Sequence, residues 1–238
     1  MLNNINISGL GKVPSGEYNN INISGSGKIL GDVKANIMDV SGSGKVLNNL
    51  EVNNICTSGY FKVFGDVKAN EKIACSGSFK CDKNIVANNL SICGSLKTLG
   101  NITFDLIELS GLIKVIGDCE GRKICGEGKV NVKGLLSADE IDLKLLGQSR
   151  ANELGGENIR IIAGRTQSLK IFCFSYIQKI QLCCNIIEGD NIYLENTIAK
   201  VVRGKNITIG KDCVIEKIEC SGELKIEEGS KVKEKIAV

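Results

Sequence analysis

Two short runs of the sequence combine glycines with a lysine, residue types that bind phosphate groups in many proteins. Ser-Gly-Ser-Gly-Lys occupies 24–28 and recurs at 41–45. A P-loop needs two glycines separated by four residues, then Lys and Ser or Thr, between a strand and a helix. Here the glycines are two positions apart, Ile29 and Val46 follow the lysines, and no helical pattern comes next. The runs therefore do not predict a nucleotide site, and their recurrence needs another explanation.

The chain offers few side chains for catalysis or for metal binding. It contains no histidine, the side chain whose ordinary pKa makes it the usual acid–base group near neutral pH. No column of carboxylates converges along the sequence, so we expect no enzyme, no cofactor and no metal site. Nucleic acid is not an expected partner either, because the net charge is only +3 and aromatic residues are not interleaved with the basic ones.

The eleven cysteines form no paired C-x-x-C motifs. The first residues show no basic stretch followed by an apolar one, as a signal peptide would, and no window has the roughly 18 apolar residues of a membrane span. Reduced thiols in the cytoplasm are therefore the expectation. Cys75, Cys81 and Cys119 occupy apolar positions of a repeat and are predicted to be buried.

The two Gly–Lys runs are copies of a longer repeat. Eight small residues, each followed by glycine, recur at steps of 15 to 18 residues: Ser8, Ser24, Ser41, Ser58, Ser76, Cys93, Ser110 and Cys125. A lysine stands four positions after each of them: Lys12, Lys28, Lys45, Lys62, Lys80, Lys97, Lys114 and Lys129. A period this regular indicates a solenoid, in which each turn buries its apolar side chains against the next turn.

Apolar residues alternate with polar ones on both sides of the repeated glycine. In the second copy Ile21 and Ile23 precede it, Ile29 follows it, and Val33 and Ala35 form a further pair. Alternation with a period of two predicts strands that bury one face. Three short strands in about 17 residues predict an all-β fold, a parallel β-solenoid of roughly triangular section. Glycine at the corner is expected to supply a backbone with positive φ.

The repeat divides the chain into four segments. Regular turns occupy 1–138, looser turns occupy 139–163, an interruption occupies 164–188, and further turns with a cap occupy 189–238.

The interruption is the least repetitive segment. Apolar residues recur there at helical spacing and predict a short amphipathic helix: Leu169, Phe172, Cys173, Tyr176, Ile177, Ile180 and Cys184. Two roles stay open for it. Either it docks on a membrane surface or on another protomer through Leu169, Phe172, Tyr176, Ile177 and Ile180, or it packs over the solenoid's own side or cap.

Several turns resemble the repeat of the bactofilins. The segments that carry the resemblance are Gly-Lys-Ile-Leu-Gly-Asp-Val-Lys-Ala-Asn at 27–36, Phe-Lys-Val-Phe-Gly-Asp-Val-Lys-Ala-Asn at 61–70 and Ile-Lys-Val-Ile-Gly-Asp-Cys-Glu-Gly at 113–121. Bactofilins are bacterial cytoskeletal proteins whose right-handed β-helix polymerises end to end without bound nucleotide. The resemblance implies a right-handed β-helix and a cytoplasmic scaffold that binds copies of itself.

The ends of the solenoid are the expected sites of that assembly, because unpaired strand edges are templates for pairing. The candidate residues are Ile5 and Ile7 in the first turn and Leu224 and Ile226 near the last. An alternative is a discrete binding module, in which the charged C-terminal residues 227–238 cap one end. A remote alternative is an acyltransferase of the hexapeptide-repeat type, because residues 207–217 resemble one of its turns. The 17-residue period and the absence of histidine argue against it.

The eight lysines form a ladder along the predicted solenoid. One hypothesis is that the ladder contacts anionic lipid, cell-wall precursors or the acidic face of a partner protein. The other is that it is a solvated column that keeps the solenoid soluble and discourages sideways aggregation.

Overall fold

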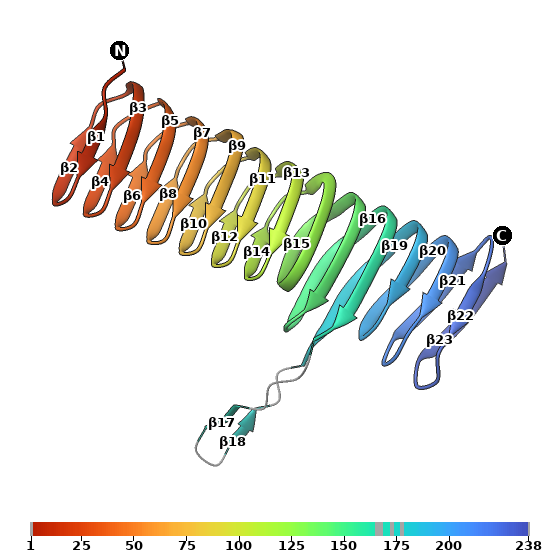
Figure 1. Cartoon of the computed structure of the whole chain (residues 1–238). Helices are drawn as coiled ribbons and strands as arrows, with labels where there is room; N and C mark the ends of the chain where they lie inside the picture. Colours follow the sequence, from red (N-terminus) through yellow and green to blue (C-terminus); the bar gives the residue numbers. More distant parts are fainter. Residues whose placement is uncertain (1, 165–168, 172–173, 177–178, 238) are drawn as a thin grey trace. The chain divides into compact units, whose positions relative to one another are not determined.

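The computed structural model of the chain describes residues 2–164, 169–171, 174–176 and 179–237. Within these ranges the chain forms strands joined by turns, without helices (Figure 1). It divides into two compact units, Met1–Glu120 and Gly121–Val238. Each unit is a parallel β-solenoid, as the repeat predicts.

In the first unit short strands alternate with longer ones, and strands one turn apart pair in parallel (Figure 1). The strands are β1 (Ile5–Ile7), β2 (Leu10–Val13), β3 (Gly16–Ile23), β4 (Ser26–Ile29), β5 (Val33–Val40), β6 (Ser43–Val46), β7 (Leu50–Thr57), β8 (Tyr60–Val63), β9 (Val67–Cys75), β10 (Ser78–Cys81), β11 (Ile85–Ile92), β12 (Ser95–Thr98), β13 (Ile102–Leu109) and β14 (Leu112–Val115).

Each long strand has two straight parts. In the ladder between β5 and β7, Val33–Ala35 pairs with Leu50–Val52 and Ile37–Val40 pairs with Asn54–Thr57, while Asn36 between them is left out. The short strand that follows is the third straight part of the turn. Each turn thus has three sides, as the apolar pairs of the sequence predict.

Inward-pointing side chains stack in columns along the first unit. One such column is Ile21, Met38, Ile55, Ile73, Leu90 and Ile107, and all six are buried. In another column Gly27 and Gly44 precede Phe61 and Phe79, whose rings stack with centroids 5.2 Å apart. A Cβ atom on Gly27 would lie 2.9 Å from Cδ1 of Ile23. The second glycine of Ser-Gly-Ser-Gly-Lys therefore leaves space for neighbouring side chains in the core.

The first glycine of the motif lies at a corner, and the expected reason for it is wrong in the first unit. Among the described residues, positive φ at glycine occurs at Gly16, Gly126 and Gly229. Of the eight repeat glycines, only Gly126 is in this set. At the other corners glycine is required because the preceding turn occupies the space where a Cβ atom would lie. A Cβ atom at each of six corner glycines would meet the carbonyl oxygen of the corner glycine one turn earlier, well inside the 3.0 Å that Cβ atoms keep: Gly25, Gly42, Gly59, Gly77, Gly94 and Gly111.

The other two corners of the first unit are joined by side-chain hydrogen bonds between turns. At the bend of the long strand, each asparagine amide donates to the asparagine side chain one turn earlier, at 2.7–3.3 Å, along the series Asn4, Asn19, Asn36, Asn53 and Asn70. At the corner before the long strand, each side-chain oxygen accepts the backbone N–H one turn later, at 2.9–3.1 Å, along the series Asp32, Asn49, Asp66, Asn84, Asn101 and Asp118.

The second unit has four long strands that bend within the turn, followed by three shorter ones (Figure 1). These are β15 (Cys119–Leu145), which begins in the first unit, β16 (Gln148–Ala163), β19 (Gln181–Leu194), β20 (Thr197–Ile209), β21 (Val214–Cys220), β22 (Leu224–Ile226) and β23 (Lys231–Ala237). They pair in parallel, and Ile159, Ile192 and Ile207 occupy equivalent positions in successive turns. All three are buried.

The helix predicted in the interruption is wrong. Two short strands lie there instead, β17 (Leu169–Ile171) and β18 (Phe174–Tyr176), and they pair antiparallel with Leu169 opposite Tyr176. Residues of these types favour a strand, and a short helix without tertiary support gains little stability. Phe172, Cys173 and Ile177 lie outside the described residues. The solenoid register resumes afterwards, because Gln148 pairs with Gln181.

Candidate interaction surfaces

Seven of the eight repeat lysines form a column on one face of the first unit. The parallel ladders of the short strands place each lysine directly opposite the next: Lys12, Lys28, Lys45, Lys62, Lys80, Lys97 and Lys114. We call this set the lysine column. Its members are about 4.8 Å apart, the distance between paired strands. Lys129 lies in β15 of the second unit, where it is half-buried.

The lysine column has little compensating negative charge. Lys62 forms an ion pair with Asp82 at 2.8 Å, and its ammonium lies 4.0 Å from the centre of the Phe64 ring. Lys80 lies over the ring of Tyr60, at 5.2 Å. Within the described ranges, the other lysines of the column have no ion pair. The stack is thus a row of like charges that is not neutralised by the unit's own acids.

A second column lies beside the lysines, two positions further along each turn. It comprises Pro14, Leu30, Leu47, Phe64, Asp82, Leu99 and Ile116. We call it the apolar column, although Asp82 interrupts it. Leu30 is 49% exposed, Phe64 38% and Leu99 48%. These side chains point outwards next to the ammonium groups, so the face presents apolar surface and positive charge together.

The first turn has an open edge. Within the described residues β1 pairs with β3 and β2 pairs with β4, on one side only. Ile7 is buried, Ile5 is half-buried, and Leu10 is 92% exposed. A Cβ atom on Gly9 would have no atom within 4 Å, in contrast to the other corner glycines of the unit. A hollow of about 370 Å³ is lined by residues 5–14.

The last turn is more polar. Leu224 and Ile226, the predicted end residues, are half-buried in β22, which pairs with β20. β23 pairs with β21 and is mostly exposed. Its exposed side chains include Lys231, Lys233 and Lys235, and Lys233 contacts Glu216 at 3.7 Å.

The five residues predicted to contact a membrane or a partner are not brought together on a helix. Leu169 and Tyr176 are register partners in the β17–β18 ladder. Ile180 is 8% exposed and therefore belongs to the core rather than to an outer surface. Phe172 and Ile177 lie outside the described residues. In the part of the chain that the structure describes, no helix has the length and hydrophobicity required to cross a bilayer.

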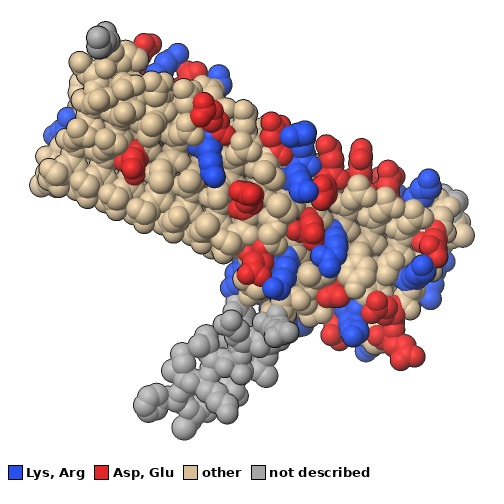
Figure 2. Space-filling view, viewed as in Figure 1, with Lys and Arg blue, Asp and Glu red and all other residues tan. Residues whose placement is uncertain are grey.

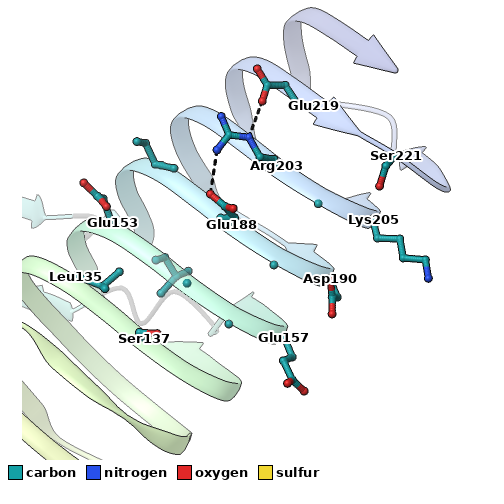
Figure 3. A pocket seen from close by; sticks show the side chains of 16 residues that line it. Leu135, Ser137, Glu153, Glu157, Glu188, Asp190, Arg203, Lys205, Glu219 and Ser221 are labelled. Atoms are coloured by element: carbon teal, nitrogen blue, oxygen red, sulfur yellow. Dashed lines mark hydrogen bonds and ion pairs between the residues drawn. The ribbon is translucent and has the colours of Figure 1, made fainter. Parts of the chain in front are cut away.

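The second unit carries a hollow of about 730 Å³ on the outside of its turns (Figure 3). Its lining includes Gly155, Gly156, Gly189 and Gly204, which contribute no side chains to it. Around them lie the charged side chains Glu153, Glu157, Glu188, Asp190, Arg203, Lys205 and Glu219. The sequence pattern does not predict this hollow, because the glycines in its lining fall outside the eight-copy repeat.

Arg203 bridges two of the carboxylates in this hollow. Its guanidinium donates to Glu188 at 3.0 Å and to Glu219 at 2.6 Å (Figure 3). Hydrogen bonds from Lys217 and Arg203 lower the pKa of the Glu219 carboxyl. Glu219 is therefore ionised at neutral pH and is unsuited to donate a proton as a general acid. The geometry fits a structural ion-pair network.

Mixed charge is common on the visible surface of the second unit. Figure 2 shows blue and red side chains interspersed over its turns. Lys123 pairs with Glu140, Lys144 with Glu127 and Arg160 with Asp142, at 2.8–2.9 Å. Opposite charges thus stack in neighbouring turns, whereas the lysine column of the first unit stacks charges of one sign.

The cysteines at inward, apolar positions of the repeat are buried thiols, as predicted. Cys75, Cys81 and Cys119 are at most 1% exposed. Burial raises the pKa of Cys75 and Cys81 to about 11, and it raises the pKa of Cys119 as well. Across the described ranges there is no group of three or more Cys, Asp or Glu side chains that is placed to hold a metal ion.

Comparison with known proteins gives two relatives from Bacillus subtilis (strain 168). The chain is 38% identical over 93 residues to the uncharacterized protein YhbE and 41% identical over 103 residues to the uncharacterized protein YhbF. These matches cover 39% and 43% of this chain, and it spans about two fifths of the length of each relative. No family model matches the chain. No solved structure matches it.

Proposed function

We propose that this chain is a non-enzymatic structural scaffold of the bactofilin type, which assembles end to end in the cytoplasm by stacking its solenoid turns without nucleotide. The β-solenoid fold supports the proposal, since successive turns of the described chain pair in parallel and each acts as a template for the next. The resemblance of the repeat to bactofilins supports it as well. The partner is a second copy of the chain.

The observation that carries the proposal is the open corner at Gly9. Six later corner glycines each face the backbone carbonyl of the preceding turn at a distance that no side chain would tolerate. Gly9 has the same place in the repeat but has no atom near its missing Cβ. The first turn therefore has the shape needed to receive another turn. Ile5, Ile7 and the exposed Leu10 lie at the same edge.

Electron microscopy of the purified protein at several concentrations tests the proposal. We expect filaments that lengthen with concentration, and sedimentation velocity should show the same trend. In Gly9→Val the new side chain projects into the space that an incoming turn would occupy. The variant should melt at the wild-type temperature, since nothing in its own chain contacts that position, but it should not form filaments.

Gly59→Val is the matched control, because the same side chain there clashes with the chain's own Gly42 carbonyl. It should lower the melting temperature whether or not the protein assembles. Filaments formed equally well by Gly9→Val, or a wild-type protein that stays monomeric at every concentration, would contradict end-to-end assembly through this edge.

A second candidate is a discrete module capped at one end. The exposed, lysine-rich β23 favours it, because like charges on two such ends repel when they approach. In that case the N-terminal edges alone would pair, and the particles would stop at dimers. A sedimentation profile that reaches a dimer plateau identifies this outcome.

A further inference from the structure

One face of the first unit differs in charge from its neighbours. The seven short strands β2, β4, β6, β8, β10, β12 and β14 form it, and their outward positions carry the lysine column. Asp82 is the one acidic side chain in the lysine and apolar columns, and it is paired with Lys62. The face is therefore strongly positive although the whole chain has a net charge of only +3.

On the side formed by the first part of the long strands, charged side chains of successive turns are arranged differently. There Glu17, Lys34, Glu51 and Lys68 alternate in sign in consecutive turns. Glu51 contacts Lys34 at 3.1 Å and Lys68 at 3.5 Å. If the lysine column served solubility alone, charges of alternating sign would be sufficient there too. Stacking lysine on lysine instead leaves uncompensated repulsion, which a negative surface would relieve.

The apolar column shows which negative surface fits. Leu30, Phe64 and Leu99 project beside the ammonium groups and are each more than a third exposed. A soluble polyanion would neutralise the lysines but would gain little from exposed leucine and phenylalanine. An anionic bilayer interface takes both, because ammonium groups contact the headgroup phosphates while apolar side chains enter the acyl boundary.

We propose that this face docks on the surface of an anionic lipid bilayer through the lysine column, with the apolar column entering the interface. The proposal goes beyond end-to-end assembly and does not depend on it. The stacked strands hold the seven lysines in register on strands about 4.8 Å apart, so several lysines reach the membrane at once.

Flotation with lipid vesicles tests the proposal on the full chain. The wild-type protein should bind vesicles of phosphatidylcholine mixed with phosphatidylglycerol, and it should not bind phosphatidylcholine alone. Lys28→Gln/Lys45→Gln/Lys114→Gln removes three exposed ammonium groups that have no ion pair in the described ranges. It should weaken partitioning by about tenfold or more.

Lys34→Gln/Lys68→Gln/Lys72→Gln is the matched control. It removes the same charge from other sides of the same unit, so its partitioning should stay within about twofold of the wild type. Gly9→Val should also bind normally, since it removes the proposed end contact but no lysine. If the control variant loses as much vesicle binding as Lys28→Gln/Lys45→Gln/Lys114→Gln, the proposal is overturned. Net charge alone would then explain the binding.

Leu30→Gln/Leu99→Gln separates a membrane from a soluble polyanion. Both side chains are half-exposed, so the variant should keep the wild-type circular dichroism spectrum while its vesicle binding falls severalfold. If this variant binds vesicles like the wild type, and inorganic polyphosphate displaces both equally, the face binds soluble polyanions and the lipid proposal is wrong. Leu169→Gln/Tyr176→Gln should leave binding unchanged. A loss there instead would assign the contact to the β17–β18 segment.

Discussion

At the corners of the first unit, contacts between single backbone atoms of successive turns require glycine. Each corner carbonyl lies where the Cβ of the next turn's residue would have to be, so the backbone of successive turns makes direct contact. The backbone N–H of Ser43 and that of Tyr60 donate to the carbonyls of Gly25 and Gly42 at 2.8 Å. A side chain at such a corner would separate these groups as well as overlap with them.

The alanine pair Gly59→Ala and Gly9→Ala measures this contact. Gly59→Ala should reduce the free energy of unfolding by about 3 kcal/mol or more, because the added methyl group meets backbone atoms that cannot rotate away. Gly9→Ala should change it by less than about 0.5 kcal/mol. Urea denaturation of dilute protein checks both values. Equal costs at the two positions would mean that turn-to-turn approach is not the constraint.

The buried thiols predict a loss of stability in alkali. Burial raises the pKa of Cys75, Cys81 and Cys213 from 9.0 to about 11. In the unfolded chain these thiols ionise first, so their contribution is fully present below pH 9 and is lost as pH rises toward 11. The urea midpoint, measured under reducing conditions, should fall across that window.

Lysines titrate in the same range, so a comparison is needed to isolate the thiols. Cys75→Ala/Cys81→Ala removes two of them and should show a shallower decline between pH 9 and pH 11 than the wild type. Identical slopes for the two proteins would assign the alkaline loss to other groups.

At the scale of elements, the interruption is an insertion between two paired strands. Gln148 in β16 pairs with Gln181 in β19, a separation of 33 residues, whereas Asn131 and Arg150 pair across 19. Deleting residues 165–178 would bring the first separation to that of the second. Since the parallel register holds on both sides, the deletion variant should keep its β spectrum and melt within a few degrees of the wild type.

Circular dichroism with thermal melting is the measurement for this deletion. A drop in the melting temperature of more than about 10 °C would show that the interruption contributes to the core. A deletion of the same length that includes all of β11, residues 82–95, serves as the contrast, because it removes buried Ile85 and Leu90 and should abolish folding.

The repeat predicted the strands because stacking forces periodicity on the sequence. Val33 and Ala35, Ile21 and Ile23 are all in strands, and the lysine column follows directly from in-register pairing. The helix prediction is wrong because the segment carries two opposing signals. The 3.6-residue spacing of its apolar residues favours a helix, whereas its aromatic and β-branched residues favour strands.

The corners were harder to predict than the strands. Positive φ is the usual reason for a turn glycine, and nothing in one turn reveals that the preceding turn occupies the space. Recurrence of the glycine in every copy was the signal that the contact is between turns. Similarly, the Asp or Asn before each long strand was visible, but its partner, the backbone N–H of the next turn, follows only once the register is known.

At the scale of the whole molecule, protection of the backbone should depend on the position of a turn. Strands in the middle of a unit have neighbours on both sides, whereas β1, β2, β22 and β23 have one within the described residues. Hydrogen exchange of dilute protein should therefore be slowest in turns such as β7–β8 and fastest in the first and last strands.

The same experiment at high protein concentration links this gradient to assembly. Slower exchange of β1 and β2 with rising concentration would agree with end-to-end stacking through the first turn. Uniform exchange along all turns, at low concentration, would contradict the view that stability is passed from neighbour to neighbour.

The spacing of the lysine column has a consequence for the ions around it. Two unit charges in water interact by about RT at roughly 7 Å, and the column places its lysines on neighbouring strands about 4.8 Å apart. Such a row holds small anions close to itself in solution. When a fixed negative surface replaces them they are released, and the entropy of their dilution drives the contact. The logarithm of the binding constant should then fall in a straight line with the logarithm of salt concentration, so the ionic content of the surrounding fluid sets how firmly this face adheres.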